Sequence, residues 1–305
     1  MFVGHGLLAF ALVALAGERL DWERRTVLAV AVLAALFGTL PDIDVVYAPV
    51  GLVLGADLAD PVESFWAAGN EVHRGVTHSL VVGALTAAGV YLLARARALD
   101  RSAGLAILGG VVTLATLVSG GLAGVVTLVF ALGAVGLVAL ARRYDITPRH
   151  TAGAALVGLL THPFGDMVTG SPPALLYPFD VTLVAGRVTL SGDTTLHLLG
   201  AFWLELAVVW LAVLAYFRLT DRRVVAHVER PAAVGVVYGA AALVLPAPTL
   251  DVSYHFVYSV LGVGAVGAVG SRPLARPTWR AVVTALTAVS VASLSYAVVY
   301  VSLAV

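Results

Sequence analysis

The sequence predicts an all-α membrane protein: a polytopic bundle of about ten transmembrane helices with both termini on the extracytoplasmic side of the cell membrane. Three observations predict this fold. First, 60% of the 305 residues are hydrophobic and only 12% are charged, far outside the composition of a soluble domain. Second, the chain divides into ten apolar segments. Third, its arginines are concentrated in alternate connections between those segments.

The apolar segments are separated by charged or proline-rich breaks, and each is a candidate transmembrane helix. They centre on residues 2–16, 26–40, 78–94, 102–118, 121–141, 150–168, 195–217, 231–246, 253–270 and 280–304. The stretch from Ser102 to Ala141 runs for 40 residues without a charge, which is too long for one span. Ser119-Gly120-Gly121 supplies the turn that splits it.

The placement of arginine tests this division independently. All 18 basic residues are arginine, and loops on the cytoplasmic side of a membrane carry the excess of basic residues. The connections after the first, third, fifth, seventh and ninth segments hold 16 of them, whereas the alternate connections hold only Arg74 and Arg187. We therefore expect both termini to be extracytoplasmic. Merging the 40-residue stretch into one span would break this alternation.

Composition also restricts the chemistry. The chain has no cysteine, which excludes disulfides, thiolate metal sites and cysteine nucleophiles. Any metal must therefore be held by His, Asp or Glu. The net charge is zero, and no basic tail indicates a nucleic-acid partner. Membrane lipid is the expected environment, and the oligomeric state is left open.

The most polar short stretch runs from His73 to Ser79 and reads His-Arg-Gly-Val-Thr-His-Ser. It places two imidazoles, a guanidinium and two hydroxyls at the start of a predicted helix. Polar groups beside a bilayer are costly unless they bind something. Neutral imidazoles suit zinc and related metals, and the planar guanidinium of Arg74 suits a phosphate or carboxylate. The alternative for Arg74 is an interfacial residue whose charge reaches towards water.

Two further stretches carry groups that can bind metal. Residues 41–44 read Pro-Asp-Ile-Asp after the second apolar segment, where two carboxylates can chelate or bridge a cation, although a solvated loop would look the same. His162 and Asp166 are four residues apart on a predicted helix, so they can bind one ion, or the carboxylate can orient the imidazole. With His5 near the start of the first segment, four parts of the chain bring such groups to the extracytoplasmic face.

A second tier of candidates has weaker support. Asp193 with His197, and Asp251 with His255, share the same four-residue spacing and the same predicted side of the membrane. Glu205 lies about two turns inside the seventh segment, where a carboxylate needs a partner. For Glu205, structural pairing is at least as good an explanation.

Taken together, these motifs resemble a membrane-bound, metal-dependent hydrolase-like family whose bacterial members are labelled LexA-binding, inner-membrane-associated hydrolases. The family pattern has an early His, Pro-Asp-x-Asp, His-Arg-Gly-x-Thr-His-Ser, His-x-x-x-Asp, and a Gly-containing segment that ends in an aromatic residue, Pro and Phe. In this sequence the five motifs stand in order at His5, 41–44, 73–79, 162–166 and 170–179. The resemblance covers roughly residues 1–180, and the seventh to tenth segments lie beyond it. We divide the chain into a hydrolase-like transmembrane domain, residues 1–217, and additional transmembrane helices, residues 218–305.

The family is distantly similar to the zinc-dependent phospholipases C and the P1-type nucleases, which cleave phosphate esters at clustered metals. The resemblance implies metal-dependent hydrolysis of a lipid phosphate ester. The predicted topology places the site at the outer membrane interface. The resemblance favours zinc, with one or two ions, since the His-x-x-x-Glu of the soluble relatives is absent here. The implied roles are metal ligation by His5, Asp44, His78 and His162, ligation or support by His73 and Asp166, bridging or general-base catalysis by Asp42, and anion binding by Arg74.

Two other functions are compatible with the same residues. In a transporter or ion-handling channel, intramembrane His and acidic residues relay protons or cations, but such groups gather near the middle of the membrane rather than at one face. An inactive scaffold would keep the metal for structure alone. Loss of activity on chelation, without flux across liposomes, would separate the enzyme from the transporter.

Overall fold

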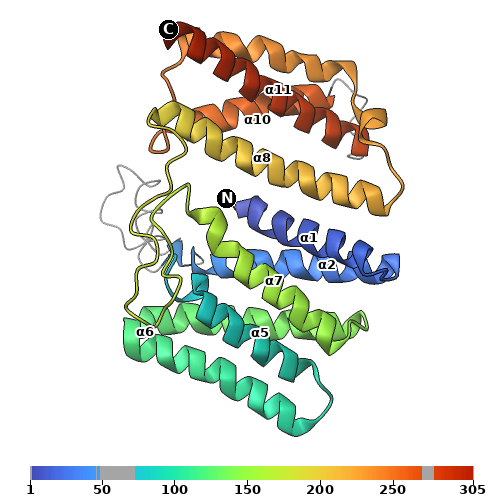
Figure 1. The fold of residues 1–305 in the computed structure, drawn as a ribbon, viewed down its shortest axis with the longest axis vertical. Coiled ribbons are helices and arrows are strands. Elements are labelled where there is room, and N and C mark those ends of the chain that lie inside the picture. The colour runs from blue at the N-terminus through green and yellow to red at the C-terminus, as the bar shows by residue number, and fades with distance from the viewer. Residues whose placement is uncertain (1, 46, 49–72, 270–277, 305) are drawn as a thin grey trace. The chain divides into compact units, whose positions relative to one another are not determined.

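A computed structural model describes residues 2–45, 47–48, 73–269 and 278–304, and these contain helices and no strand (Figure 1). The chain forms two compact units, residues 1–187 and 188–305. The helices of the first unit are α1 (Phe2–Arg19), α2 (Arg24–Thr39), the 3-10 helices η1 (Leu40–Val45) and η2 (Val76–His78), α5 (Leu80–Ala94), α6 (Ala98–Arg143) and α7 (Pro148–Asp166). Those of the second are α8 (Thr194–Leu219), η3 (Val224–His227), η4 (Arg230–Ala240), α9 (Ala241–Val244), α10 (Tyr254–Val269) and α11 (Trp279–Ala304).

The predicted class, an all-helical membrane protein, is confirmed. Four helical stretches of the described chain are long and apolar enough to cross a membrane: Arg24–Val45, Ala98–Arg143, Thr194–Leu219 and Trp279–Leu303. All ten apolar segments fall on helical structure, with 231–246 on η4 and α9, although residue 270 lies outside the described residues. The number of ten spans stays a prediction. The units divide before α8, whereas the predicted domain division placed α8 with the first domain.

The turn predicted inside the long uncharged stretch is present. α6 is bent back on itself at Gly120, whose backbone (φ 87°, ψ 178°) is not helical (Figure 1). A positive φ of this size is readily available only to glycine. Beyond the turn the two arms pack closely, because a Cβ atom at Gly124 would overlap the side chain of Thr116. Glycine therefore enables both the reversal of the chain and the tight packing of the arms that follow.

Helix α7 is central to the first unit because it packs against α1, α2 and α5. It approaches α2 closely, because a Cβ atom on Gly158 would lie 2.6 Å from the backbone nitrogen of Gly38 and 2.7 Å from the carbonyl oxygen of Ala34. Glycine at both positions lets the two backbones meet. His162 lies one turn further along α7 and is brought beside the end of α2 by this contact.

Replacing Gly158 with alanine is expected to push α7 away from α2, because neighbouring backbone cannot move aside as a flexible side chain can. Overpacking of this kind costs about 1 to 3 kcal/mol of unfolding free energy. The matched control is Gly153→Ala on the same helix, where nothing lies within 4 Å of the added Cβ atom. Thermal unfolding in detergent should show G158A, but not G153A, as destabilised. Equal stability of the two variants would contradict the close contact.

The second unit is held together by a different type of contact. The indole Nε1 atoms of Trp203 and Trp210 on α8 donate hydrogen bonds to the hydroxyls of Ser293 and Ser290 on α11, at 3.2 and 3.0 Å. Its core contains apolar and aromatic side chains, including Leu199. Hydrogen bonds between apolar helices satisfy polar groups that lipid could not.

A candidate metal centre

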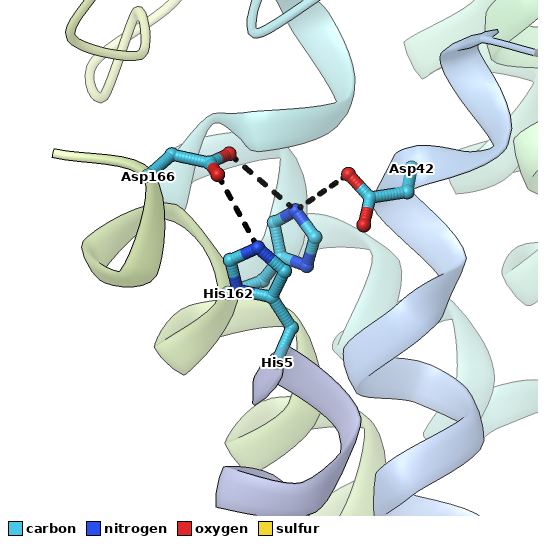
Figure 2. Close-up of side chains that lie close together, drawn as sticks. All are labelled: His5, Asp42, His162 and Asp166. Atoms are coloured by element: carbon cyan, nitrogen blue, oxygen red, sulfur yellow. Dashed lines mark ion pairs between the residues drawn. The ribbon is translucent and has the colours of Figure 1, made fainter. Parts of the chain in front are cut away.

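Polar side chains of the first unit gather where its helices begin or end. His5 lies in the first turn of α1, Asp42 and Asp44 lie in η1 directly after α2, and His78 is the last residue of η2, just before α5. His162 and Asp166 come from the final turns of α7, and Figure 2 shows them meeting His5 and Asp42. The structure therefore brings together all eight first-tier residues of the sequence analysis: His5, Asp42, Asp44, His73, Arg74, His78, His162 and Asp166.

Two overlapping groups in this cluster place four potential ligand atoms within 4.8 Å of one another. One group contains His5 and His162, the other contains His73 and His78, and both contain Asp42 and Asp166. The two carboxylates are thus shared by two pairs of imidazoles. This arrangement offers either one central ion or two ions with bridging carboxylates.

Ligand atoms of His78, His162, Asp42 and Asp166 lie close together at the centre of the cluster. His78 Nε2 lies 2.9 Å from His162 Nε2, 3.7 Å from Asp42 Oδ1 and 3.2 Å from Asp166 Oδ2. His162 Nε2 lies 3.4 Å from that Asp42 oxygen and 3.9 Å from that Asp166 oxygen (Figure 2). Tetrahedral zinc with ordinary bond lengths separates its ligand atoms by about 3.3 to 3.5 Å. The five distances between these ligand atoms run from 2.9 to 3.9 Å and so lie on both sides of that range.

Hydrogen bonds on the far side of the two central imidazoles fix which nitrogen faces the centre. His162 Nδ1 lies 2.6 Å from the carbonyl oxygen of Gly38, which can only accept, so this nitrogen carries the hydrogen. His78 Nδ1 lies 3.0 Å from the Thr77 hydroxyl oxygen and 3.3 Å from an Asp44 oxygen. Because Thr77 donates its own hydrogen to Asp44, His78 Nδ1 is the donor there. Metal-binding histidines are oriented in this way in proteins.

The two Nε2 atoms therefore point lone pairs at each other across 2.9 Å when both rings are neutral. Such a contact is repulsive unless a proton or a metal cation lies between the nitrogens. An oxygen of Asp166, Oδ2, is buried with no hydrogen-bond donor among the described residues, although it is ion-paired with His78. The donor set thus fits a divalent cation.

Charge favours a cation as well. Asp42, Asp44 and Asp166 bring three carboxylates together, and Arg74 is the one permanently charged cation in contact with the described part of the cluster. Burial lowers the pKa of His78, which precedes α5, but the carboxylates of Asp166, Asp42 and Asp44 outweigh burial and raise that pKa to about 10. The same carboxylates therefore favour a cation at this position, either a proton on His78 or a metal ion that displaces it.

Asp44 was predicted to bind the metal, and the structure places it outside both groups of four. Its side chain is fully buried, and its oxygens contact Nδ1 of His73 at 2.8 Å and Nδ1 of His78 at 3.3 Å. It also accepts hydrogen bonds from the Thr77 hydroxyl at 2.9 Å and from the backbone N–H of Arg74 at 3.3 Å. Its contacts are those of a carboxylate that orients two imidazoles.

Replacing Asp44 with asparagine is expected to weaken zinc binding by about 10- to 100-fold without abolishing it, as for other residues that orient metal-binding histidines. The amide keeps the shape of the carboxylate but loses its charge. Competition with a chelator of known affinity measures the effect. Complete loss of zinc, equal to that of His78→Ala, would instead make Asp44 a ligand.

Arg74 lies between the cluster and the segment after α7. Its Nη2 is 3.5 Å from Asp166 Oδ1, its Nη1 donates to the carbonyl oxygen of Ser171 at 3.0 Å, and its buried Nε has no hydrogen-bond partner among the described residues. The backbone of Arg74 has φ +64°, a left-handed value that is uncommon outside glycine. Strained backbone of this kind concentrates at functional sites.

The segment after α7 packs against the stretch from His73 to Ser79. Ala174 donates its backbone N–H to the carbonyl oxygen of Arg74 at 3.0 Å, and the Ser79 hydroxyl donates to the carbonyl oxygen of Tyr177 at 2.8 Å while also capping α5. A Cβ atom on Gly170 would overlap the guanidinium of Arg74. The Gly-containing motif therefore makes room for the arginine and holds its loop in place.

Three contributors to the site were not assigned these roles from sequence. The Gly38 carbonyl and the Thr77 hydroxyl orient the ligands, and Gly170 leaves space for Arg74. The hydroxyl that caps α5 is that of Ser79, two residues later. A sequence signal existed for Thr77 and Gly170, since both lie inside the motifs, but none existed for a backbone carbonyl.

None of the five second-tier residues belongs to either metal-capable group. Asp193 caps α8 by accepting the Leu196 N–H at 2.8 Å, and this bond and the Tyr300 hydroxyl hold the pKa of its carboxyl below the usual value. His197 Nδ1 accepts a hydrogen bond from Leu190 N at 3.1 Å. Asp251 and His255 are exposed, and Glu205 is half-buried within α8. For the Asp193 pair, the contacts support the structural explanation.

Apolar helices of membrane-spanning length and a buried His/Asp cluster at helix ends define a helical membrane protein with a candidate divalent-metal centre. Residues 1–120 match the sequence model of a family described as YdjM inner membrane protein. The match includes His5, 41–44 and 73–79, and stops before His162 and Asp166. No match was found among curated proteins or among solved structures.

Proposed function

We propose that this chain is an integral-membrane, metal-dependent hydrolase that cleaves a phosphate ester of a lipid at the outer face of the cell membrane. The observation that carries the proposal is the inner set of ligand atoms on His78, His162, Asp42 and Asp166, with the guanidinium of Arg74 in contact with the last of them. Metal centres beside an arginine suit anionic phosphoryl groups. The resemblance to the metal-dependent hydrolase-like family points the same way.

In this proposal the central imidazoles and the two shared carboxylates hold the ion, and His5 and His73 flank them. A divalent ion, with zinc favoured, polarises a phosphoryl oxygen and lowers the pKa of water when bound. Asp42, with its side chain partly accessible, is placed to accept a proton from the attacking water. Arg74 binds the anionic oxygens of the substrate through donors that its contacts with Ser171 and Asp166 leave free.

The bilayer would supply the substrate. The cluster lies at one end of the helices of the first unit, as a site that meets a lipid headgroup requires. A transporter would place these groups midway along the helices. Lipid substrates also explain why a hydrolase would be built from apolar helices, which a soluble phosphate ester would not need.

The proposal is tested with purified protein reconstituted into liposomes that contain one lipid phosphate at a time, spanning phosphomonoesters and phosphodiesters. Zinc-dependent release of the phosphate or headgroup from at least one lipid, abolished by a chelator and without zinc flux across the bilayer, is the expected result. Zinc flux without hydrolysis would favour the transporter. Tight zinc binding with neither hydrolysis nor flux would favour the inactive scaffold.

The proposed side of the membrane rests on the uneven distribution of arginine. We expect reporters fused to either terminus to be extracytoplasmic, because 16 of the 18 arginines lie on the opposite side in the ten-span arrangement. Two reporter fusions at each terminus, one active only in the cytoplasm and the other only outside it, show on which side of the membrane that terminus lies. Cytoplasmic activity at either terminus would move the metal centre to the other face.

A further inference from the structure

The end of the first unit opposite the candidate metal centre is rich in arginine. Helices α1 and α7 carry cluster residues at one end and arginine at the other: Arg19 is the last residue of α1, and Arg149 lies in the first turn of α7. Residues 18–25, 95–101 and 142–149 connect α1 to α2, α5 to α6 and α6 to α7 at this end (Figure 1). These three stretches, here called the arginine face, contain nine arginines and five acidic residues, which gives a net charge of +4.

Two contacts make the arginine face continuous. The ring of Trp22, between α1 and α2, has its centroid 4.4 Å from that of His150, in the first turn of α7. The guanidinium of Arg142, near the end of α6, donates hydrogen bonds to the carbonyl oxygens of Leu93 and Arg95 at the end of α5. Since α6 leads directly into α7, all three stretches adjoin one another in the folded unit.

Much of this positive charge is not neutralised within the protein. An ion pair joins Arg95 to Asp100 at 3.2 Å. Five other arginines are exposed and have no carboxylate partner among the described residues: Arg19, Arg25, Arg97, Arg143 and Arg149. Like charges gathered on one surface raise the electrostatic potential there and attract ions of the opposite charge. The arginine face is therefore a surface that favours an anionic partner.

The helix ends on this face add to the positive potential. Arg24 and Arg25 lie in the first turn of α2, and Arg149 and His150 lie in the first turn of α7. Neither turn contains an acidic residue, and Glu23, directly before α2, does not cap that helix with its side chain. The N-terminus of a helix carries a partial positive charge, so cationic side chains are unfavourable there unless an anion is near.

Apolar side chains on the arginine face favour a lipid over a soluble anion. Leu20 is 61% exposed, Leu99 is 80% exposed and Tyr144 is 63% exposed. The headgroup layer of a membrane accommodates arginine beside apolar and aromatic side chains, because the charged groups meet phosphates while the apolar groups reach the acyl chains. Apolar helices end at this face, which is where the headgroup layer of a surrounding bilayer is expected.

We propose that the arginine face binds the phosphate groups of anionic phospholipids in the leaflet opposite the metal centre. A guanidinium is planar and always charged, and it donates paired hydrogen bonds to phosphate oxygens. Exposed arginines from three connections give the surface room for more than one headgroup. This binding is independent of the proposed hydrolysis, because the arginine face contains none of the candidate metal ligands.

The test measures lipid binding by the full-length protein, stripped of lipid in a non-ionic detergent, using native mass spectrometry. The two probes are palmitoyl-oleoyl phosphatidylglycerol, which is anionic, and phosphatidylcholine with the same acyl chains, which has no net charge. Each arginine near an anionic lipid surface contributes about a fivefold gain in affinity. We therefore expect the wild type to bind phosphatidylglycerol at least about 30-fold more tightly than phosphatidylcholine.

Charge-removing variants locate the binding surface. Arg149→Gln should weaken phosphatidylglycerol binding about three- to fivefold, and combining it with Arg25→Gln and Arg143→Gln should weaken it about 30-fold or more. Phosphatidylcholine binding should stay unchanged in every variant. The matched control is Arg187→Gln, which removes one exposed arginine outside the arginine face and should bind both lipids as the wild type does.

Three results would overturn the proposal. The first is equal affinity of the wild type for the two lipids. The second is wild-type phosphatidylglycerol affinity in a triple variant that is folded by size-exclusion chromatography, or in Arg149→Gln if the triple variant does not fold. The third is displacement of phosphatidylglycerol by an oligonucleotide that binds more tightly and depends on the same arginines, which would assign the face to nucleic acid.

Discussion

Replacing Asp166 with alanine is expected to remove both the bound metal and the hydrolytic activity. This carboxylate belongs to both groups of candidate ligands, contacts His5 at 3.3 Å and His78 at 3.2 Å, and lies 3.5 Å from Arg74. Its loss leaves neither group with its full set of donors. We expect activity to fall on the order of 1,000-fold or more, equivalent to about 4 kcal/mol of transition-state stabilisation.

The measurements for this variant are zinc content by elemental analysis and hydrolysis of the lipid phosphate cleaved by the wild type. The matched control is Asp193→Ala, which removes the cap of α8 and costs about 1 kcal/mol of stability, but leaves the candidate ligands untouched. Asp166→Asn separates charge from shape, because it keeps the side-chain volume. Wild-type zinc content and activity in D166A would show that the cluster is not the metal centre.

Arg74→Ala is expected to keep the metal and lose turnover. The guanidinium would bind the phosphoryl oxygens rather than the ion, so its removal leaves the His and Asp donors in place. Losing one charged contact that acts mainly in the transition state costs about 2 to 4 kcal/mol, which is roughly 30- to 1,000-fold in rate. The rate is measured on zinc-loaded protein across the same panel of lipid phosphates.

Two further variants sharpen this prediction. Arg187→Ala is the matched control, because Arg187 is exposed and is the other arginine of the predicted extracytoplasmic side. Gly170→Ala should reproduce part of the R74A loss, because its Cβ atom would displace the guanidinium while leaving the charge in the protein. If R74A matched the wild type on every substrate, the arginine would serve only to hold its loop and Asp166.

The pattern of polarity was enough to predict which ends of the helices meet. Each candidate stretch follows or precedes an apolar segment, and the alternation of arginine assigned those ends to one side, so His5, His78 and His162 were expected together. The uncharged stretch of 40 residues is too long for one span, so it must contain a reversal of the chain. The Ser119-Gly120-Gly121 sequence indicated where, and the structure has the turn at Gly120. These inferences depend on length and periodicity, which are properties of the sequence itself.

The orientation of side chains could not be predicted in this way. The Asp44 carboxylate could face either the centre of the cluster or the Nδ1 atoms of His73 and His78. Its direction depends on the rotation of η1 relative to η2, and tertiary packing determines that rotation. The close contact of Gly158 with Gly38 is likewise a tertiary contact without a local signal. Spacing alone also does not distinguish a ligand pair from a helix cap, and Asp193, directly before α8, is a cap.

The central claim is that the cluster around His78 and His162 holds a divalent metal, and the zinc content of the purified protein tests it most directly. Full-length protein is equilibrated with zinc, freed of unbound metal and analysed beside His78→Ala and the exposed control His255→Ala. The account predicts between one and two zinc ions per wild-type chain, the same in H255A, and almost none in H78A. No stoichiometric zinc in the wild type, or equal zinc in H78A, would contradict it.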